Sequence, residues 1–312
     1  MPTQLLSRAE IRARWGDLLA GFEPAPPGHP IASGLPAGAV TDDTEQAVLL
    51  ARLLVRRQGT IDPDEWAAAL VTWERGMAAR GSLDLLGPST KRAIEAVLAG
   101  TPPEQAGSGG TTNGAAMRVA PVGLTVSPDD LLILVNRVVQ ASYVTHNTGT
   151  ALAGAAAVAA AVSAGVGGAT VAEATELGIQ AAHVAASRGH WVAGADVASR
   201  IAWAVGLVTS RPRREAADLI YRLVGTSLAT QESVPAAFAV LAAVPGDPWQ
   251  ACLLAASLGG DTDTIAAMTG AISGACHGID TFPPAALPVI DAQDLGLAAL
   301  ADDLLALRSR GT

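Results

Sequence analysis

Apolar residues recur at helical spacing along most of the chain, whereas the apolar–polar alternation that marks a β-strand is almost absent. Strands and helices do not alternate either, so the pattern predicts one all-α domain over residues 1–312 rather than a parallel sheet. Four helices are predicted from a capping residue followed by proline or an acidic residue, and further helices from their apolar spacing; the expected total is about a dozen. The ranges are 62–65, 127–130, 170–173 and 247–248 for the four starts, and 88–98, 195–208, 213–222, 233–243 and 294–308 for the other helices.

Three segments rich in glycine and proline, at 23–40, 80–88 and 100–114, are predicted to be loops. The third, which includes TPPEQAGSGGTTNG, is both long and glycine-dense. Long loops inside a folded domain are often functional, so this loop is a candidate part of a site.

Residues 138–172 contain no Asp, Glu, Lys or Arg, which raises the question of a membrane span. Ala, Gly, Ser and Thr dominate the segment, and the Leu, Ile and Phe residues that favour insertion are few. His146, Asn147 and the glycines at 165–168 also interrupt it. The composition therefore predicts a buried helix that packs closely against its neighbours.

Composition narrows the class of protein further. The 312 residues are 50% hydrophobic, with a mean hydropathy of +0.34, which predicts a large core. A net charge of −9 argues against nucleic acid as a partner, and the one dense basic run, RPRR at 211–214, is flanked by acidic residues. Cys252 and Cys276 stand outside any CxxC pattern, so neither a disulfide framework nor a zinc site is expected. The N-terminal stretch lacks the apolar core of a signal peptide, and we expect a cytoplasmic protein.

Two clusters of acidic residues and threonines, TDDTE at 41–45 and GGDTDT at 259–264, each precede an apolar helix. One interpretation is an ordinary helix start, because Thr and Asp cap helices and acidic residues favour the N-terminal end of the helix dipole. A second interpretation follows from the repetition. Four carboxylates brought together would repel one another unless cations neutralise them, and oxygen-only ligands suit Mg²⁺ or Mn²⁺ better than zinc. The pair of clusters thus predicts a site for two divalent cations.

The two clusters together resemble the paired metal-binding signature of the ADP-ribosylglycohydrolase family. TNGAAMRVAPVGL at 112–124 and YVTHN at 143–147 resemble internal motifs of the same family, in the same order. The similarity extends from about residue 7 to near the end of the chain. It implies an all-helical fold with a two-metal cleft.

The resemblance also assigns roles to individual residues. Two Mg²⁺ (or Mn²⁺) ions would be held by Thr41, Asp42, Asp43, Asp261, Asp263 and Thr264. The substrate's ribose or phosphate groups would be contacted by Asn113, Gly114 and His146. Asp43 or Asp263 would stabilise positive charge or accept the proton of the attacking water.

Structural interpretations stand beside several of these roles. His146 is also compatible with a hydrogen-bonded core histidine, and Gly114 with a simple turn residue. Arg118 is a candidate structural ion-pair partner. His277 lies about four turns from Asp261 along one predicted helix, which favours a structural role.

The chain departs from the family pattern in one respect. Family members usually begin with an apolar helix that carries a GDALG-like motif, followed by a glutamate that reaches the site. SRAEIRARWG at 7–16 resembles what normally follows this element. We therefore expect the chain to lack the family's first helix, which affects the expected activity more than metal binding.

The resemblance implies a metal-dependent glycohydrolase that cleaves the N- or O-glycosidic bond between ADP-ribose and a protein side chain or small acceptor. Three alternatives remain: a hydrolase of a small nucleoside or ribosyl metabolite, a metal-binding protein with little activity, and a two-metal phosphatase. Loop 100–114 would discriminate between an ADP-ribosyl substrate and a small ribosyl metabolite. A loop that closes around adenine and diphosphate favours ADP-ribose, whereas a cleft that admits only a ribose favours the metabolite. We expect a monomer that binds neither nucleic acid nor membranes.

Overall fold

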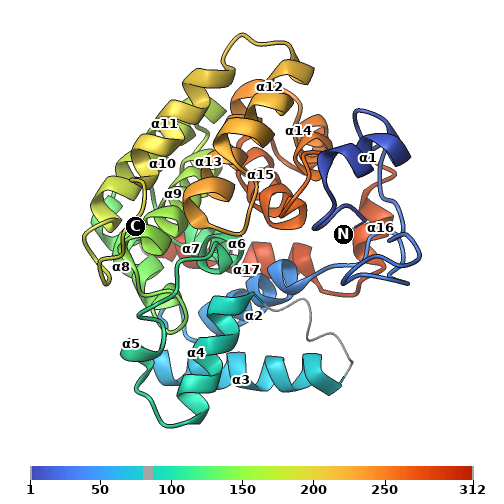
Figure 1. Ribbon diagram of the computed structural model, residues 1–312. Coiled ribbons are helices and arrows are strands. Elements are labelled where there is room, and N and C mark those ends of the chain that lie inside the picture. The colour runs from blue at the N-terminus through green and yellow to red at the C-terminus, as the bar shows by residue number, and fades with distance from the viewer. Residues whose placement is uncertain (1, 80–86, 311–312) are drawn as a thin grey trace.

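The computed structural model describes residues 2–79 and 87–310, so most of the loop predicted at 80–88 lies outside the described residues. The described residues form helices and no strands, apart from two isolated β-bridges (Figure 1). The α-helices are α1 (Arg8–Trp15), α2 (Asp42–Arg56), α3 (Pro63–Ala79), α4 (Pro88–Leu98), α5 (Pro103–Ala106), α6 (Gly114–Arg118), α7 (Ala120–Thr125), α8 (Leu131–Ser142), α9 (Gly149–Val166), α10 (Val171–Ala185), α11 (Val197–Val208), α12 (Arg213–Leu219), α13 (Thr230–Ala243), α14 (Pro248–Ala256), α15 (Thr262–His277), α16 (Leu287–Asp291) and α17 (Leu297–Arg310). The prediction of an all-α fold is confirmed.

The described helices outnumber the predicted dozen because α5, α6, α7, α12 and α16 are short, with four to seven residues each. The helix predicted at 213–222 is divided, since α12 ends at Leu219 and a π-helix continues from Ile220 to Val224. A second short element, the 3₁₀-helix Ile279–Thr281, follows α15.

Most of the predicted helix starts are confirmed. Asp62 Oδ1 accepts the backbone N–H groups of residues 64 and 65, and Thr170 forms a reciprocal capping box with Glu173. Asp247 caps α14 in the same way. The start predicted at Ser127 is wrong, because α8 begins later and Asp130 caps it.

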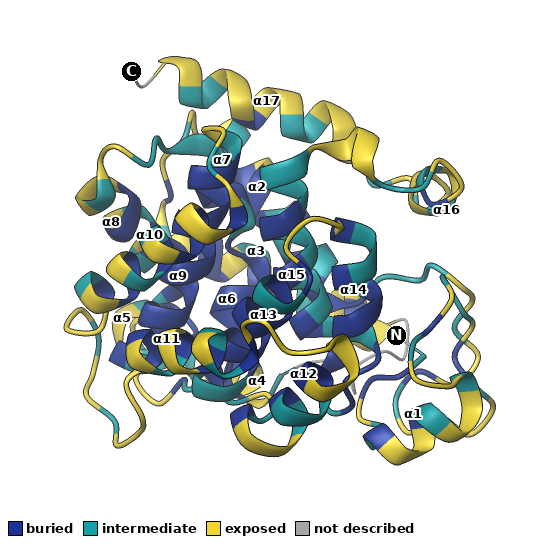
Figure 2. Ribbon diagram, turned by 90° about the horizontal axis from the view of Figure 1, so that it is seen from above, coloured by how far each residue is buried: buried dark blue, intermediate teal, exposed yellow. Residues whose placement is uncertain are grey.

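Helix α9 lies at the centre of the molecule, and 89% of its length is buried (Figure 2). It is the one described helix long and apolar enough to cross a membrane, but its surroundings are protein: α6, α7, α8, α10 and α15 pack around it. Its small residues allow these contacts. A Cβ atom added to Gly123 of α7 would lie 2.4 Å from the carbonyl oxygen of Ala159, so the two backbones touch. The predicted buried helix is confirmed.

Elements from both ends of the chain meet beside this core. Helix α2 packs against α6 and α15, and α13 packs against α15 (Figure 1). The N-terminal segment 2–6 crosses the start of α15, because Leu5 N donates to Gly260 O (2.8 Å) and Gly260 N donates to Leu6 O (2.9 Å). This arrangement places the N-terminal ends of α2 and α15, with their acidic clusters, next to each other.

Candidate active site

The acidic residues at the starts of α2 and α15 do not cap these helices. Thr41 occupies the N-cap of α2, yet its hydroxyl donates to Asp43 Oδ2 (2.7 Å) and no side-chain capping bond is present. Asp261 occupies the N-cap of α15, and its Oδ2 accepts from Asn113 Nδ2 (2.6 Å) instead of a backbone N–H. An ordinary helix start therefore does not account for either cluster.

The carboxylates of the two clusters converge. One carboxylate oxygen from each of Asp42, Asp43 and Asp263 lies within 4.8 Å of the others. The charge of Asp261 acts on Asp42 and Asp263, and the hydroxyl of Thr264 lies beside Asp43 and Asp261. All of the residues predicted as metal ligands are thus in one place, although their role as ligands stays a prediction.

Burial sets the protonation of this cluster. Burial, reinforced by the neighbouring charges of Asp43 and Asp261, raises the pKa of Asp42 well above its usual value. Asp263 has a pKa raised for the same reasons, and burial followed by the charge of Asp43 raises the pKa of Asp261 to about 6. The pKa of Asp43 is also raised by burial, with the hydroxyls of Thr41 and Thr264 opposing the shift. Without a cation, these carboxyl groups therefore hold their protons to higher pH than a free aspartate does.

The cluster fits the divalent cations that the sequence predicts. Three carboxylate oxygens are buried and have no hydrogen-bond partner: Asp43 Oδ1 and both oxygens of Asp263. Asp263 as a whole residue is only partly buried. Among residues 2–79 and 87–310, no Lys or Arg forms an ion pair with any of the four aspartates. Buried, unpartnered carboxylates of this kind are stable when they coordinate cations, and an oxygen-only set suits Mg²⁺ or Mn²⁺.

A small polar cavity opens on one side of the cluster. It has a volume of about 100 Å³ and is lined by Gln4, Leu5, Ile31, Asp42, Gly87, Pro88, Thr90, Thr112, Asn113, Gly114, Met117, Leu228, Asp261 and Thr264. Its polar groups are carboxylates, amides and hydroxyls, and no Lys, Arg or His is among the described lining residues. We call it the polar cleft.

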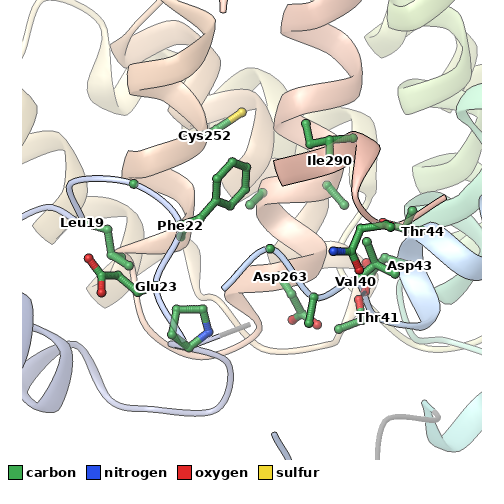
Figure 3. Close-up of a pocket in the computed structure, with 18 of the residues that line it drawn as sticks. Leu19, Phe22, Glu23, Val40, Thr41, Asp43, Thr44, Cys252, Asp263 and Ile290 are labelled. Carbon is green, nitrogen blue, oxygen red and sulfur yellow. Dashed lines mark hydrogen bonds between the residues drawn. The ribbon is translucent and has the colours of Figure 1, made fainter. Parts of the chain in front are cut away.

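A larger cavity of about 350 Å³ opens on the other side. Figure 3 shows Thr41, Asp43 and Asp263 at one end of it, with apolar side chains such as Phe22 and Ile290 along its walls. It shares part of its lining with an apolar cavity of about 610 Å³ between α2, α15 and α17. The carboxylates therefore separate a polar cleft from an apolar space.

The three residues predicted to contact substrate occupy different positions. Asn113 and Gly114 line the polar cleft. His146 lies behind Gly114 and is fully buried, with Nε2 bonded to Thr112 Oγ1 (3.0 Å) and Nδ1 to Thr145 Oγ1 (2.7 Å). Burial and the charges of Arg118 and Arg92 hold the pKa of His146 well below its usual value, so the ring is neutral. This environment is that of the hydrogen-bonded core histidine considered above, and contact with a ligand stays a prediction.

Arg118 and His277 make contacts with other residues of the protein that are typical of structural roles. Arg118 is fully buried, donates to Gln46 Oε1 (2.5 Å) and to the Thr145 hydroxyl, and lies over the ring of Trp66. It forms no ion pair with any described residue, so the predicted ion-pair role is replaced by neutral hydrogen bonds. His277 Nδ1 bonds to Ser273 O (2.9 Å) at the far end of α15.

Two residues at the cleft, Gln4 and Ser233, were not predicted from the sequence. Gln4 is buried in the cleft lining, and its Oε1 has no partner. Ser233 of α13 accepts a hydrogen bond from Asn113 Nδ2 (2.9 Å). The only signal for Ser233 was a polar residue within an apolar stretch, and Gln4 carried none.

Comparisons with known proteins bear on the family and the fold of the chain. Residues 1–312 match the family described as ADP-ribosylglycohydrolase. The chain is 35% identical over 293 residues to the uncharacterized protein YegU of Escherichia coli, covering 94% of this chain and 87% of YegU. It is 34% identical over 277 residues to an uncharacterized protein of Archaeoglobus fulgidus, covering 88% and 82%. A solved structure named as an ADP-ribosylglycohydrolase-related protein complex superposes with a TM-score of 0.64 at 25% identity, covering 97% of this chain and 96% of that one.

Proposed function

Because this chain belongs to the ADP-ribosylglycohydrolase family, we propose that it is a metal-dependent hydrolase that cleaves the glycosidic bond between a ribosyl group and its acceptor. The observation that carries the proposal is the convergence of four buried carboxylates beside a polar cleft, with three of their oxygens left without partners. Perturbed carboxylates that line a cleft are typical of catalytic sites.

The ions would be held by Thr41, Asp42, Asp43, Asp261, Asp263 and Thr264, and would supply a water molecule with a lowered pKa. Asp42 and Asp261 face the polar cleft, where they would accept hydrogen bonds from the sugar. Asp43 or Asp263 would accept the proton of the attacking water. The same carboxylates would stabilise the positive charge that develops on the sugar ring as the acceptor leaves.

The expected substrate is ADP-ribose attached to a protein side chain or small acceptor. One observation favours the smaller alternative, a nucleoside or other ribosyl metabolite: the cleft of about 100 Å³ has room for a sugar ring, and the described residues that line it offer no cationic side chain for a diphosphate. Loop 100–114 also packs onto the segment 143–147, because Asn147 N donates to Gly107 O (2.8 Å). In an ADP-ribosyl substrate, the diphosphate would lie outside the cleft.

An assay with Mg²⁺ or Mn²⁺ tests these substrates against each other. We expect hydrolysis of ADP-ribosyl-arginine or of members of a nucleoside panel, and no hydrolysis of a generic phosphate ester. Asp263→Asn should lower the rate roughly 100-fold or more, because general-base and metal-ligand roles have at least that magnitude. Hydrolysis of the phosphate ester alone would indicate a phosphatase, and cation binding without any hydrolysis would indicate a non-catalytic protein.

A further inference from the structure

Ser233 lies in the first turns of α13 and connects this helix to the polar cleft. Its hydroxyl donates to the carbonyl oxygen of Ala229 (3.1 Å), so the hydroxyl proton is already used. Its oxygen is left as an acceptor, and it receives a hydrogen bond from Asn113 Nδ2 (2.9 Å). Ser233 is fully buried, so water does not compete for these bonds.

The direction of these bonds fixes the amide of Asn113. The Nδ2 group donates both to Ser233, whose own proton is used at Ala229, and to Asp261 Oδ2 (2.6 Å), which accepts as a carboxylate. A flipped amide would place Oδ1 against two acceptors. Asn113 Oδ1 forms no hydrogen bond with any residue among 2–79 and 87–310, which leaves it as the group that the amide presents to the cleft.

Backbone contacts keep Asn113 and α13 in register. Asn113 N donates to Leu228 O (3.0 Å), and Thr112 pairs with Ala229 in an isolated antiparallel bridge. Thr230 Oγ1 donates to the carbonyl oxygen of Thr111 (2.9 Å). Residues 111–113 and 228–230 are thus held together next to the Ser233–Asn113 bond.

We propose that Ser233 is a positioning residue that locks the amide of Asn113, so that its NH₂ group holds Asp261 and its carbonyl oxygen accepts a hydrogen bond from a sugar hydroxyl. The sugar part of this inference rests on the proposed function, whereas the orientation of the amide does not. Together with Asp42, Asp261 and Gln4 Oε1, the oriented Asn113 makes the cleft rich in acceptors. A cleft of this kind selects a ligand with several hydroxyl donors.

Exchange of the Asn113 side-chain amide protons with solvent, followed by NMR with Mg²⁺ present, tests the orientation directly. The resonances are assigned by their loss in Asn113→Asp. We expect slow exchange in the unmodified protein, exchange roughly five- to ten-fold faster in Ser233→Ala, and recovery in Ser233→Thr, because one hydrogen bond is removed and then restored. Ser273→Ala is the matched control, since Ser273 of α15 makes the same bond to the carbonyl four residues before it but has no asparagine partner.

Unchanged exchange in Ser233→Ala, or equal acceleration in Ser273→Ala, would overturn the proposal.

A second measurement compares the hydrolysis of a nucleoside with that of its 2′-deoxy and 3′-deoxy analogues. Ser233→Ala should reduce the preference for one hydroxyl roughly five- to ten-fold, while Ser273→Ala should not. Equal preference in both variants would overturn the role of Asn113 in the cleft. If the unmodified protein hydrolyses no glycoside while the exchange results are as expected, the proposed function fails and the positioning role stands.

Discussion

Gly114 occupies a position where the cleft leaves no room for a side chain. A Cβ atom there would lie 2.8 Å from His146 Cε1, 3.0 Å from His146 Nε2 and 3.3 Å from Thr90 Oγ1. The His146 ring cannot move aside easily, because both of its nitrogens are hydrogen-bonded. We expect Gly114→Ala to lower the free energy of unfolding by about 1–3 kcal/mol, the usual cost of overpacking, and to lower the affinity for substrate.

The measurement is urea unfolding of Gly114→Ala beside Gly206→Ala. Gly206 lies within α11, and no atom outside the neighbouring helix backbone stands within 4 Å of the position that an added methyl group would take, so alanine there should be neutral or stabilising by up to about 1 kcal/mol. Equal free energies of unfolding for the two variants would show that the environment of His146 is looser than the structure indicates.

The four aspartates also predict how stability depends on pH. Because burial raises their pKa values in the folded state, these four groups bind more protons in the metal-free folded protein than in the unfolded chain, and their contribution to stability falls as the pH rises. For Asp261, with a folded pKa of about 6, the loss develops between about pH 4 and about pH 6 and reaches about 3 kcal/mol. Asp261→Asn should remove this part of the dependence.

The difference between the two stability–pH profiles, measured in EDTA by urea unfolding, isolates Asp261 from other titrating groups. Asp303→Asn on α17 is the control, because Asp303 is exposed and far along the chain from the cluster. A metal-free protein that gains stability over this range, with Asp261→Asn showing no difference, would contradict the raised pKa.

Single residues differ in how far the sequence identifies them. The convergence of the acidic clusters at 41–43 and 261–264 was predictable, because two matching patterns occur at helix starts. Ser233 was not, since its importance depends on Asn113, which lies 120 positions away along the chain. The environment of His146 likewise follows from Thr112, whose approach no local pattern encodes.

At the scale of elements, α13 shows why boundaries were harder to predict than helices. The sequence predicted a helix at 233–243, but α13 begins at Thr230 and contains Pro235. Proline lacks the N–H that would bond to Gln231 O, and Arg200 Nε from α11 supplies that bond instead (3.1 Å). The hydrogen bond from Arg200 of α11 therefore supports the first turn of α13, which the sequence pattern did not predict. Short helices such as α6 and α7 depend on tertiary contacts in the same way, because few residues cannot form a stable helix alone.

Arg200 is accordingly expected to stabilise this pair of helices. Its Nη2 donates to Val224 O (2.6 Å) in addition to the bond to Gln231 O, so its removal leaves two carbonyl groups without these charged donors. We expect Arg200→Met to lower the free energy of unfolding by about 2 kcal/mol. Arg211→Met, which removes an exposed ion pair with Glu215, should change it by less than about 1 kcal/mol. Thermal and urea unfolding of both variants provide the comparison, and equal losses would contradict the helix-supporting role.

At the scale of the whole molecule, the fold class and the convergence of the two acidic clusters were predictable, and the spaces around them were not. The apolar cavity of about 610 Å³ lies between α2, α15 and α17, whose relative placement no sequence pattern specifies. The size of the polar cleft likewise depends on segments as distant as Gln4, Thr90 and Leu228. The sequence therefore predicted the acidic cluster, whereas the packing of distant segments determines how large a substrate can reach that cluster.

The cluster also joins α2 to α15, so cations bound there should stabilise the whole fold. A cation that binds only the folded state, at about 100 times its dissociation constant, adds about 2.7 kcal/mol, which corresponds to roughly 5 °C in melting temperature. We expect EDTA to lower the melting temperature of the Mg²⁺- or Mn²⁺-loaded protein by this order. Asp263→Asn should abolish most of the difference, because both oxygens of Asp263 are buried without partners and are available to a cation.

The quantity to compare is the difference between the melting temperatures with and without the cation. In EDTA alone, Asp263→Asn can melt higher than the unmodified protein, since it removes one repelling charge. Asp303→Asn should keep the full difference. An equal response of both variants to EDTA would show that the stabilising cation binds elsewhere.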